Sequence, residues 1–174
     1  MQPDLVPVTL RYALLLAACW PPAVHAQASK EQIKAALVFN FMKFTEWPAE
    51  PASAPLVLCL ANADRRTEAA FGQVNGRTIE SRAIQVRALP GPDAGACHLV
   101  YIHDGSARDV LDRISSSNPK VMTVGDQDDF TEAGGAIGLV EQNGRVQFKV
   151  NMDMLRKGNY KVSSQLLKLA VNLR

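Results

Sequence analysis

Apolar side chains recur with the period of an α-helix over residues 33–48. Four of them fall on one stripe of such a helix and two more lie beside it: Ile33, Leu37, Phe41 and Phe44, with Val38 and Met42. Most of the circumference is then apolar. The pattern therefore predicts a helix that is largely buried.

The polar side of this predicted helix is narrow. Asn40, Lys43 and Glu46 are spaced three residues apart and form a single ridge, with Phe39 and Trp47 next to it. Two interpretations stay open at this point. The ridge either ties the helix to the C-terminal helix of the same chain, or it contacts a partner protein.

Three short apolar runs follow, and continuous apolarity over so few residues predicts strands that are buried on both faces. They span residues 56–60, 97–102 and 121–124. Asp64 is positioned to cap a helix over residues 65–73, and Ser106 to cap another that turns Val110, Leu111 and Ile114 inward. The alternating pattern over residues 78–89 predicts an edge strand.

The C-terminal third begins with the strongest hairpin signal in the chain. Asn143-Gly144 predicts that a strand over residues 136–140 pairs with one over residues 145–150. Asn151 then caps a short helix that stops at Gly158, and Ser163 caps a final helix. The apolar stripe of that final helix consists of Leu166, Leu169, Ala170 and Leu173.

Buried strands that alternate with helices predict an α/β fold. Because helical crossovers join strands in parallel, we expect a mostly parallel sheet with helices on both faces. The final hairpin adds an antiparallel pair at one edge of that sheet.

The first 26 residues have the pattern of an export signal. Arg11 supplies the positive end, residues 12–20 the apolar run, and Val24-His25-Ala26 a small-residue cleavage site. We therefore expect residues 1–26 to be a signal peptide and residues 27–174 to form one periplasmic domain. Two alternatives remain: Leu16-Ala17-Ala18-Cys19 resembles a lipobox, which would anchor the chain through a lipid on Cys19, and an apolar N-terminus also occurs in cytoplasmic proteins.

Export would leave two cysteines, Cys59 and Cys97, in the mature chain. An oxidising periplasm permits these two residues to form a disulfide. The alternative is a pair of buried free thiols on neighbouring strands.

Composition narrows the classes of function. The 174 residues are 47% hydrophobic and 21% charged, as in a globular domain. The 19 basic and 17 acidic residues give a net charge of +2, and no basic cluster is interleaved with aromatic residues. This distribution argues against a nucleic-acid partner.

Candidate chemistry lies where the predicted parallel strands end, since loops converge there on a crevice. The polar residues at these ends are Asn62, Asp64, His103, Asp104, Asp126, Asp128 and Asp129. Such Asp residues can bind Mg²⁺ or act as a base, but more often they cap helices. The sequence has no phosphate-binding loop, no nucleophile elbow and no zinc-ligand spacing, so we expect no enzyme, cofactor or metal. One alternative is a small-ligand sensor that uses the crevice near Asn62, His103 and Asp126.

Taken together, the motifs resemble the YfiR family of periplasmic proteins along nearly the whole mature chain. In chain order the matching pieces are Lys34-Ala35-Ala36, Phe39-Asn40-Phe41, Lys43-Phe44-Thr45-Glu46-Trp47-Pro48, residues 56–60, Asn75-Gly76-Arg77, residues 97–102, Thr123-Val124-Gly125-Asp126 with Phe130, Gly134-Gly135-Ala136-Ile137, Gly144-Arg145-Val146-Gln147-Phe148, Asn151-Met152-Asp153 and residues 161–169.

This resemblance implies a regulator that is not an enzyme. Such a protein binds the periplasmic sensor portion of an inner-membrane diguanylate cyclase and represses it, which lowers cyclic di-GMP and biofilm formation. A redox change, or capture by a peptidoglycan-associated outer-membrane lipoprotein, relieves the repression. Family members also tend to form homodimers.

One departure from the family pattern concerns the cysteines. Glu132 and Leu139 stand near the places where a second cysteine pair would be expected, so any redox switch would depend on Cys59 and Cys97. For a binding protein the exposed polar residues are the candidate site. We expect partner binding at Arg156, Lys161, Ser163, Ser164 and Gln165, and at Asn40, Lys43 and Glu46.

Overall fold

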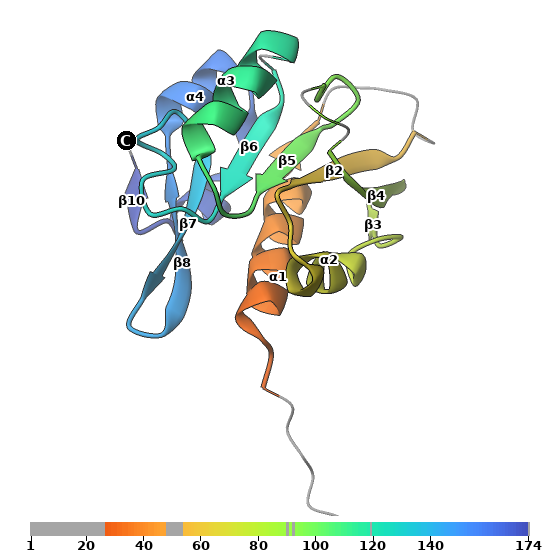
Figure 1. The fold of residues 1–174 in the computed structure, drawn as a ribbon, viewed down its shortest axis with the longest axis horizontal. Coiled ribbons are helices and arrows are strands. Elements are labelled where there is room, and N and C mark those ends of the chain that lie inside the picture. Colours follow the sequence, from red (N-terminus) through yellow and green to blue (C-terminus); the bar gives the residue numbers. More distant parts are fainter. Residues whose placement is uncertain (1–26, 48–53, 90, 92, 119, 174) are drawn as a thin grey trace, which may run out of the picture.

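Eight strands form one twisted sheet in the computed structural model, which describes residues 27–47, 54–89, 91, 93–118 and 120–173 (Figure 1). The order across the sheet is β10-β8-β7-β6-β5-β2-β4-β3. The strands are β2 (Leu56–Ala61), β3 (Thr78–Ile79), β4 (Arg82–Ala88), β5 (Leu99–Ile102), β6 (Met122–Gly125), β7 (Ile137–Gln142), β8 (Arg145–Val150) and β10 (Asn172–Leu173). The predicted signal peptide and Cys19 lie outside the described residues.

The sheet is mostly parallel, as predicted. The five strands from β4 to β7 run in the same direction, whereas β3 is antiparallel to β4 and β8 is antiparallel to β7. Asn143 and Gly144 form the β7–β8 turn with φ of 51° and 72°. The predicted hairpin is therefore confirmed, although the two-residue strand β10 lies outside it.

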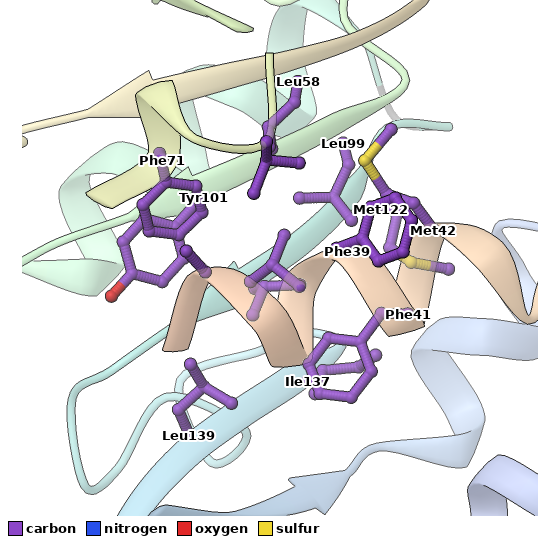
Figure 2. Packing of buried hydrophobic residues seen from close by; sticks show 14 of the residues in the cluster. Phe39, Phe41, Met42, Leu58, Phe71, Leu99, Tyr101, Met122, Ile137 and Leu139 are labelled. Atoms are coloured by element: carbon purple, nitrogen blue, oxygen red, sulfur yellow. The ribbon is translucent and has the colours of Figure 1, made fainter. Parts of the chain in front are cut away.

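Helices cover both faces of the sheet. Successive residues on a strand point to opposite faces, so neighbouring side chains belong to different hydrophobic clusters. Leu58 and Tyr101 face the cluster that contains α1 (Lys30–Lys43) and α2 (Arg65–Gly72). Their neighbours Cys59 and Val100 face the opposite cluster, which contains α3 (Ala107–Ser117). Figure 2 shows α1 lying against the first face, with its aromatic side chains packed onto the strands.

Helix α1 ends earlier than the sequence pattern predicts. Its last residue is Lys43, and the chain then forms the two-residue strand β1 (Thr45–Glu46). Side chains beyond the end satisfy the last carbonyls of the helix: the hydroxyl of Thr45 donates to the carbonyl of Phe41, and Nε1 of Trp47 donates to that of Met42, both at 2.7 Å. Glu46 is therefore not part of a helical ridge, which corrects that prediction.

The buried stripe of α1 also differs from the prediction. Ile33 is 39% exposed, while Phe39, which was placed beside the polar ridge, is buried. The guanidinium of Arg77 lies 3.7 Å from the centre of the Phe39 ring. Val38, Phe41 and Met42 are buried as predicted, so the buried surface of α1 extends to the Phe39 side beyond what the pattern indicated.

The predicted C-terminal helix is mostly wrong. Two short helices, α4 (Met152–Lys157) and α5 (Ser164–Leu167), are capped by Asn151 and Ser163 as expected. After α5, however, the chain turns and adds β10 to the open edge of β8, where the amide of Val171 donates to the carbonyl of Phe148. Leu166 is buried, but Leu169 and Leu173 are 70% and 50% exposed.

The predicted edge strand over residues 78–89 is divided in two. Glu80 adopts a φ of 55°, which separates β3 from β4 by a tight turn. The two-residue strand β3 is the outermost strand at this side of the sheet, and β4 lies between β3 and β2. Within the described part of the chain, no helix is long and apolar enough to cross a membrane.

Candidate functional site

A short antiparallel ladder joins two distant parts of the chain. Strand β1 pairs with β9 (Lys161–Val162), so that Glu46 lies opposite Lys161 and Thr45 opposite Val162. The amide of Ser163 extends the ladder by donating to the carbonyl of Phe44 at 2.9 Å. Residues that the sequence predicted in two separate segments thus come together on one surface.

The charged groups on this ladder face solvent. Nζ of Lys161 lies 3.3 Å from Oε2 of Glu46, and each side chain is 74% exposed. The ammonium of Lys43 lies 5.6 Å from the centre of the Phe44 ring. An ion pair this exposed contributes about 1 kcal/mol or less to folding, so its charges remain available for interactions with another molecule.

A hollow of about 500 Å³ adjoins the ladder. Its lining includes four of the predicted partner-binding residues, namely Lys43, Glu46, Lys161 and Ser163. The other predicted residues, Asn40, Arg156, Ser164 and Gln165, are not in that lining. Arg156 instead pairs with Asp153 on α4 at 2.6 Å. We call the surface formed by Lys43, Glu46, Trp47, Lys161 and Ser163 the ladder surface.

Trp47 holds the ladder surface against the sheet. Besides its hydrogen bond to the carbonyl of Met42, its ring meets the ring of His98 edge-on at 5.9 Å and that of Tyr160 at 6.2 Å between centroids. The hydroxyl of Tyr160 donates to the carbonyl of Lys120. Burial raises the pKa of Tyr160, so it remains a neutral hydrogen-bond donor.

The two cysteines are joined, with 5.9 Å between their Cα atoms. Cys59 lies in β2 and Cys97 in the loop before β5, and both are buried on the α3 face. Of the two alternatives left open by the sequence, the structure therefore has the disulfide. The bond fixes the start of β5 to the neighbouring strand.

A second polar region lies at the opposite, carboxyl-terminal end of the parallel strands. Asp126, just after β6, accepts hydrogen bonds from Lys34 at 2.6 Å, from the hydroxyl of Tyr101 at 2.9 Å and from the backbone amide of Asp104 at 3.3 Å. Nδ1 of His103 lies 2.8 Å from the same carboxylate. Because a carboxylate only accepts, Nδ1 carries the proton in this arrangement.

Burial and hydrogen bonding act in opposite directions on this cluster. Desolvation by itself raises the pKa of Asp126, but the hydrogen bonds from Lys34 and His103 outweigh it and hold the pKa below its ordinary value of 3.8. Burial, together with the negative charge of Asp126, raises the pKa of Tyr101. The cluster thus consists of a carboxylate whose oxygens are already bound by protein groups.

Sequence reasoning placed His103, Asp104 and Asp126 at one crevice, and the structure does bring them together. Asn62 joins them through a hydrogen bond from its side-chain amide to the carbonyl of Asp104 at 3.3 Å. Lys34 was missed as the partner of Asp126 because the two residues are 92 positions apart. Asp64 caps α2 as predicted, and the hydrogen bond from the backbone amide of Thr67 lowers its pKa, while its Oδ1 also lies 3.9 Å from Nε2 of His103.

Comparison with solved structures shows that the chain has the fold of known α/β domains. A domain protein from Vibrio cholerae O1 biovar El Tor matches with a TM-score of 0.54 at 7% identity. A Streptococcus pneumonia ABC domain in complex with L-Trp matches with a TM-score of 0.52 at 11% identity. These matches cover 85% and 83% of this chain, which spans 61% and 60% of those chains. At such low identity they establish the fold alone.

The family is established by a different comparison. A family model described as YfiR/HmsC-like matches residues 31–171, and the chain belongs to this family. The family is periplasmic and regulatory rather than catalytic, and it acts in diguanylate cyclase signalling.

Proposed function

We propose that this protein represses an inner-membrane diguanylate cyclase by binding the periplasmic sensor portion of that enzyme. Repression would lower cyclic di-GMP and biofilm formation. The observation that best supports this proposal, beside family membership, is the ladder surface: β1 and β9 gather charged residues from two distant segments onto one exposed ladder.

The ladder surface has the composition of a docking site. Trp47 supplies a rigid aromatic group, and aromatic anchors contribute much of the affinity at protein interfaces. Lys43, Glu46 and Lys161 supply charges of both signs, which set partner choice and association rate. The exposed predicted residues Arg156, Ser164 and Gln165 would form the periphery of the contact, and Asn40 its edge on α1.

The cellular setting is part of the proposal. Residues 1–26 would direct export and residues 27–174 would act as one periplasmic domain, with lipid anchoring at Cys19 as the alternative. The active species would be a homodimer, and a peptidoglycan-associated outer-membrane lipoprotein would compete with the cyclase. Intact-mass spectrometry of the exported protein tests the first statement, because the mass of a chain that begins at Gln27 agrees with cleavage, whereas the mass of a lipid-modified chain that begins at Cys19 does not.

The alternative function, a small-ligand sensor at the crevice of Asn62, His103 and Asp126, has less support. Asp126 is fully engaged by Lys34, Tyr101, His103 and a backbone amide, so a ligand would have to displace these contacts. A cluster of this kind is better suited to holding α1, β5 and β6 together.

A charge-exchange series tests the proposed docking site. The proteins are the mature chain and the periplasmic portion of an inner-membrane diguanylate cyclase from the same organism, and the measurement is binding by calorimetry. Glu46→Lys and Lys161→Glu should each weaken binding about tenfold. The double exchange restores the internal ion pair but presents reversed charges, so it should remain defective if the ladder surface docks.

Controls for this series come from another exposed ion pair. Lys30 and Glu141 lie 2.6 Å apart on a different part of the surface, with side chains 59% and 47% exposed. Lys30→Glu and Glu141→Lys should leave the affinity unchanged. Full recovery in the double exchange of Glu46 and Lys161 would show that the pair has only an internal role, and the docking proposal would then be wrong.

A further inference from the structure

A larger hollow, of about 700 Å³, lies next to the ladder surface and shares Glu46, Trp47 and Lys161 with it. Its described lining continues over the start of β2, the loop that contains Cys97 and the segment between α4 and β9. A volume of this size is within the range of small-molecule sites and far exceeds that of a bare inorganic ion. Neither the family nor the proposed docking site assigns a role to this hollow.

The charge in this hollow is strongly unbalanced. Four cations line it, namely Arg87, Lys120, Lys157 and Lys161, against the single described carboxylate of Glu46. Lys161 already pairs with Glu46. Arg87, Lys120 and Lys157 therefore face the hollow without a described acidic partner there, and a concave site with this excess attracts anions.

Arg87 is the most informative of these cations. One of its terminal nitrogens, Nη2, donates to the carbonyl of Ala96 at 3.1 Å. Its Nε is buried and has no hydrogen-bond partner among the described residues. An unsatisfied buried donor is costly, and a guanidinium fork matches the oxygens of a carboxylate or a phosphate. A small rotation of this side chain toward an anion in the hollow would satisfy it.

The hollow also offers surface for the body of a ligand. Trp47 and Tyr160 form part of its wall and contact each other edge-on. Asn118 lines the hollow as well, and beyond its hydrogen bonds to Ala94 and Lys120 its side-chain amide has a second hydrogen and a second lone pair that can orient a hydroxyl group. Aromatic and polar side chains around an excess of cations suit an organic anion better than an inorganic one.

We propose that this hollow binds a small organic anion, about the size of a sugar, through a phosphate or carboxylate held by Arg87, Lys120 and Lys157. The site does not depend on the cyclase, because all of its described lining belongs to this chain. Since it shares Glu46, Trp47 and Lys161 with the ladder surface, an occupied hollow would present that surface differently to a partner.

Binding is tested on the purified mature chain without any partner, by calorimetry and thermal melting. The probes are glucose 6-phosphate, glucuronate, inorganic phosphate and neutral glucose. We expect one or both sugar anions to bind more tightly than phosphate and to raise the melting temperature by a few degrees, while glucose has no effect. The stronger of the two sugar anions identifies the anionic group. Equal responses to glucose and to the anions, or none at all, would overturn the proposal.

Matched variants separate a specific site from general attraction. Lys120→Gln and Lys157→Gln alter exposed side chains, so both should fold normally and weaken anion binding about tenfold each. Arg108→Gln removes an exposed cation on α3 outside the hollow and should change nothing. Equal weakening by Arg108→Gln and Lys120→Gln would mean that only net charge matters, which contradicts the site. Because this assay contains no cyclase, its failure leaves the proposed repressor function intact, and failure of that function leaves this site intact.

Discussion

The two ends of the sheet contain the same kinds of charged residues in opposite settings. At the carboxyl-terminal end, Asp126 and Lys34 are joined at 2.6 Å with side chains only 6% and 20% exposed. At the other end, Glu46 and Lys161 lie 3.3 Å apart and are both 74% exposed. The comparison indicates that the first pair holds elements together, whereas the second pair is free to change partners.

The two ends also differ in how they are held together. Near the ladder surface the disulfide between Cys59 and Cys97 joins β2 to the loop before β5. At the far end the Asp126 cluster joins the first turns of α1 to β5 and β6 without a covalent bond. The following predictions test this division, from the largest expected effect to the smallest.

Removal of the disulfide should have the largest effect on stability. For cysteines 38 positions apart, the chain-entropy model gives a contribution of about 4 kcal/mol to the free energy of unfolding. Cys59→Ala with Cys97→Ala should therefore lower the melting temperature by about 10 °C. Alanine is chosen because it places no unsatisfied hydroxyl in the core.

Reductant provides the control for this variant. It should lower the melting temperature of the native protein toward that of the double variant and leave the double variant unchanged. A native protein that melts equally with and without reductant would contradict the disulfide.

Loss of the buried carboxylate should come next. Asp126→Asn leaves the partly buried Lys34 without its charged partner, and breaking a pair of this kind costs about 3 kcal/mol in free energy of unfolding. Urea denaturation of the native protein and of Asp126→Asn measures this difference in free energy of unfolding. If the free energy of unfolding changed by less than about 1 kcal/mol, the pair of Lys34 and Asp126 would contribute no more than an exposed ion pair. The proposed difference between the two ends of the sheet would then be wrong.

Acid should affect the same cluster. The pKa of Asp126 is lower in the folded chain than its ordinary value of 3.8, so its stabilising contribution is present above that pH and is lost as the pH falls further. Below about pH 4 the free energy of unfolding should fall more steeply for the native protein than for Asp126→Asn. Asp64 and Glu31 also have lowered pKa values, but both proteins retain them, so the difference isolates Asp126. Parallel pH profiles would count against this assignment.

The smallest effect on stability should come from the exposed pair. Lys161→Glu should change the free energy of unfolding by about 1 kcal/mol or less, because solvent screens both charges. Its effect on partner binding should nevertheless exceed that of Asp126→Asn at a temperature where both proteins are folded. A large loss of stability in Lys161→Glu would mean that β1 and β9 depend on this ion pair.

The parts of the fold that depend on local pattern were predictable from the sequence. Continuous apolar runs gave β2, β5 and β6, and Asn143-Gly144 gave the hairpin. The end of α1 and the replacement of a C-terminal helix by β10 were not predictable. Both depend on pairing between distant strands, β1 with β9 and β10 with β8, which local periodicity does not encode.

The residues of the candidate site were likewise predictable only in part. The sequence indicated Lys43, Glu46, Lys161 and Ser163 in two separate segments, and only the ladder brings them to one surface. It also indicated Asp126 and His103 at strand ends, where sheet topology makes them neighbours. The sequence did not indicate Lys34 or Arg87 as site residues. Lys34 forms a salt bridge with a residue 92 positions away, and the Nε of Arg87 is buried by tertiary packing, so neither property is visible in the local sequence pattern.

The most direct test of the central claim is the level of cyclic di-GMP in cells that lack this protein. Deletion should raise it, and expression of the native chain or of Lys30→Glu should restore the low level. Lys161→Glu, secreted in equal amount, should fail to restore it. A deletion strain with an unchanged level of cyclic di-GMP under every growth condition would contradict repression, and full restoration by Lys161→Glu would contradict the ladder surface as the docking site.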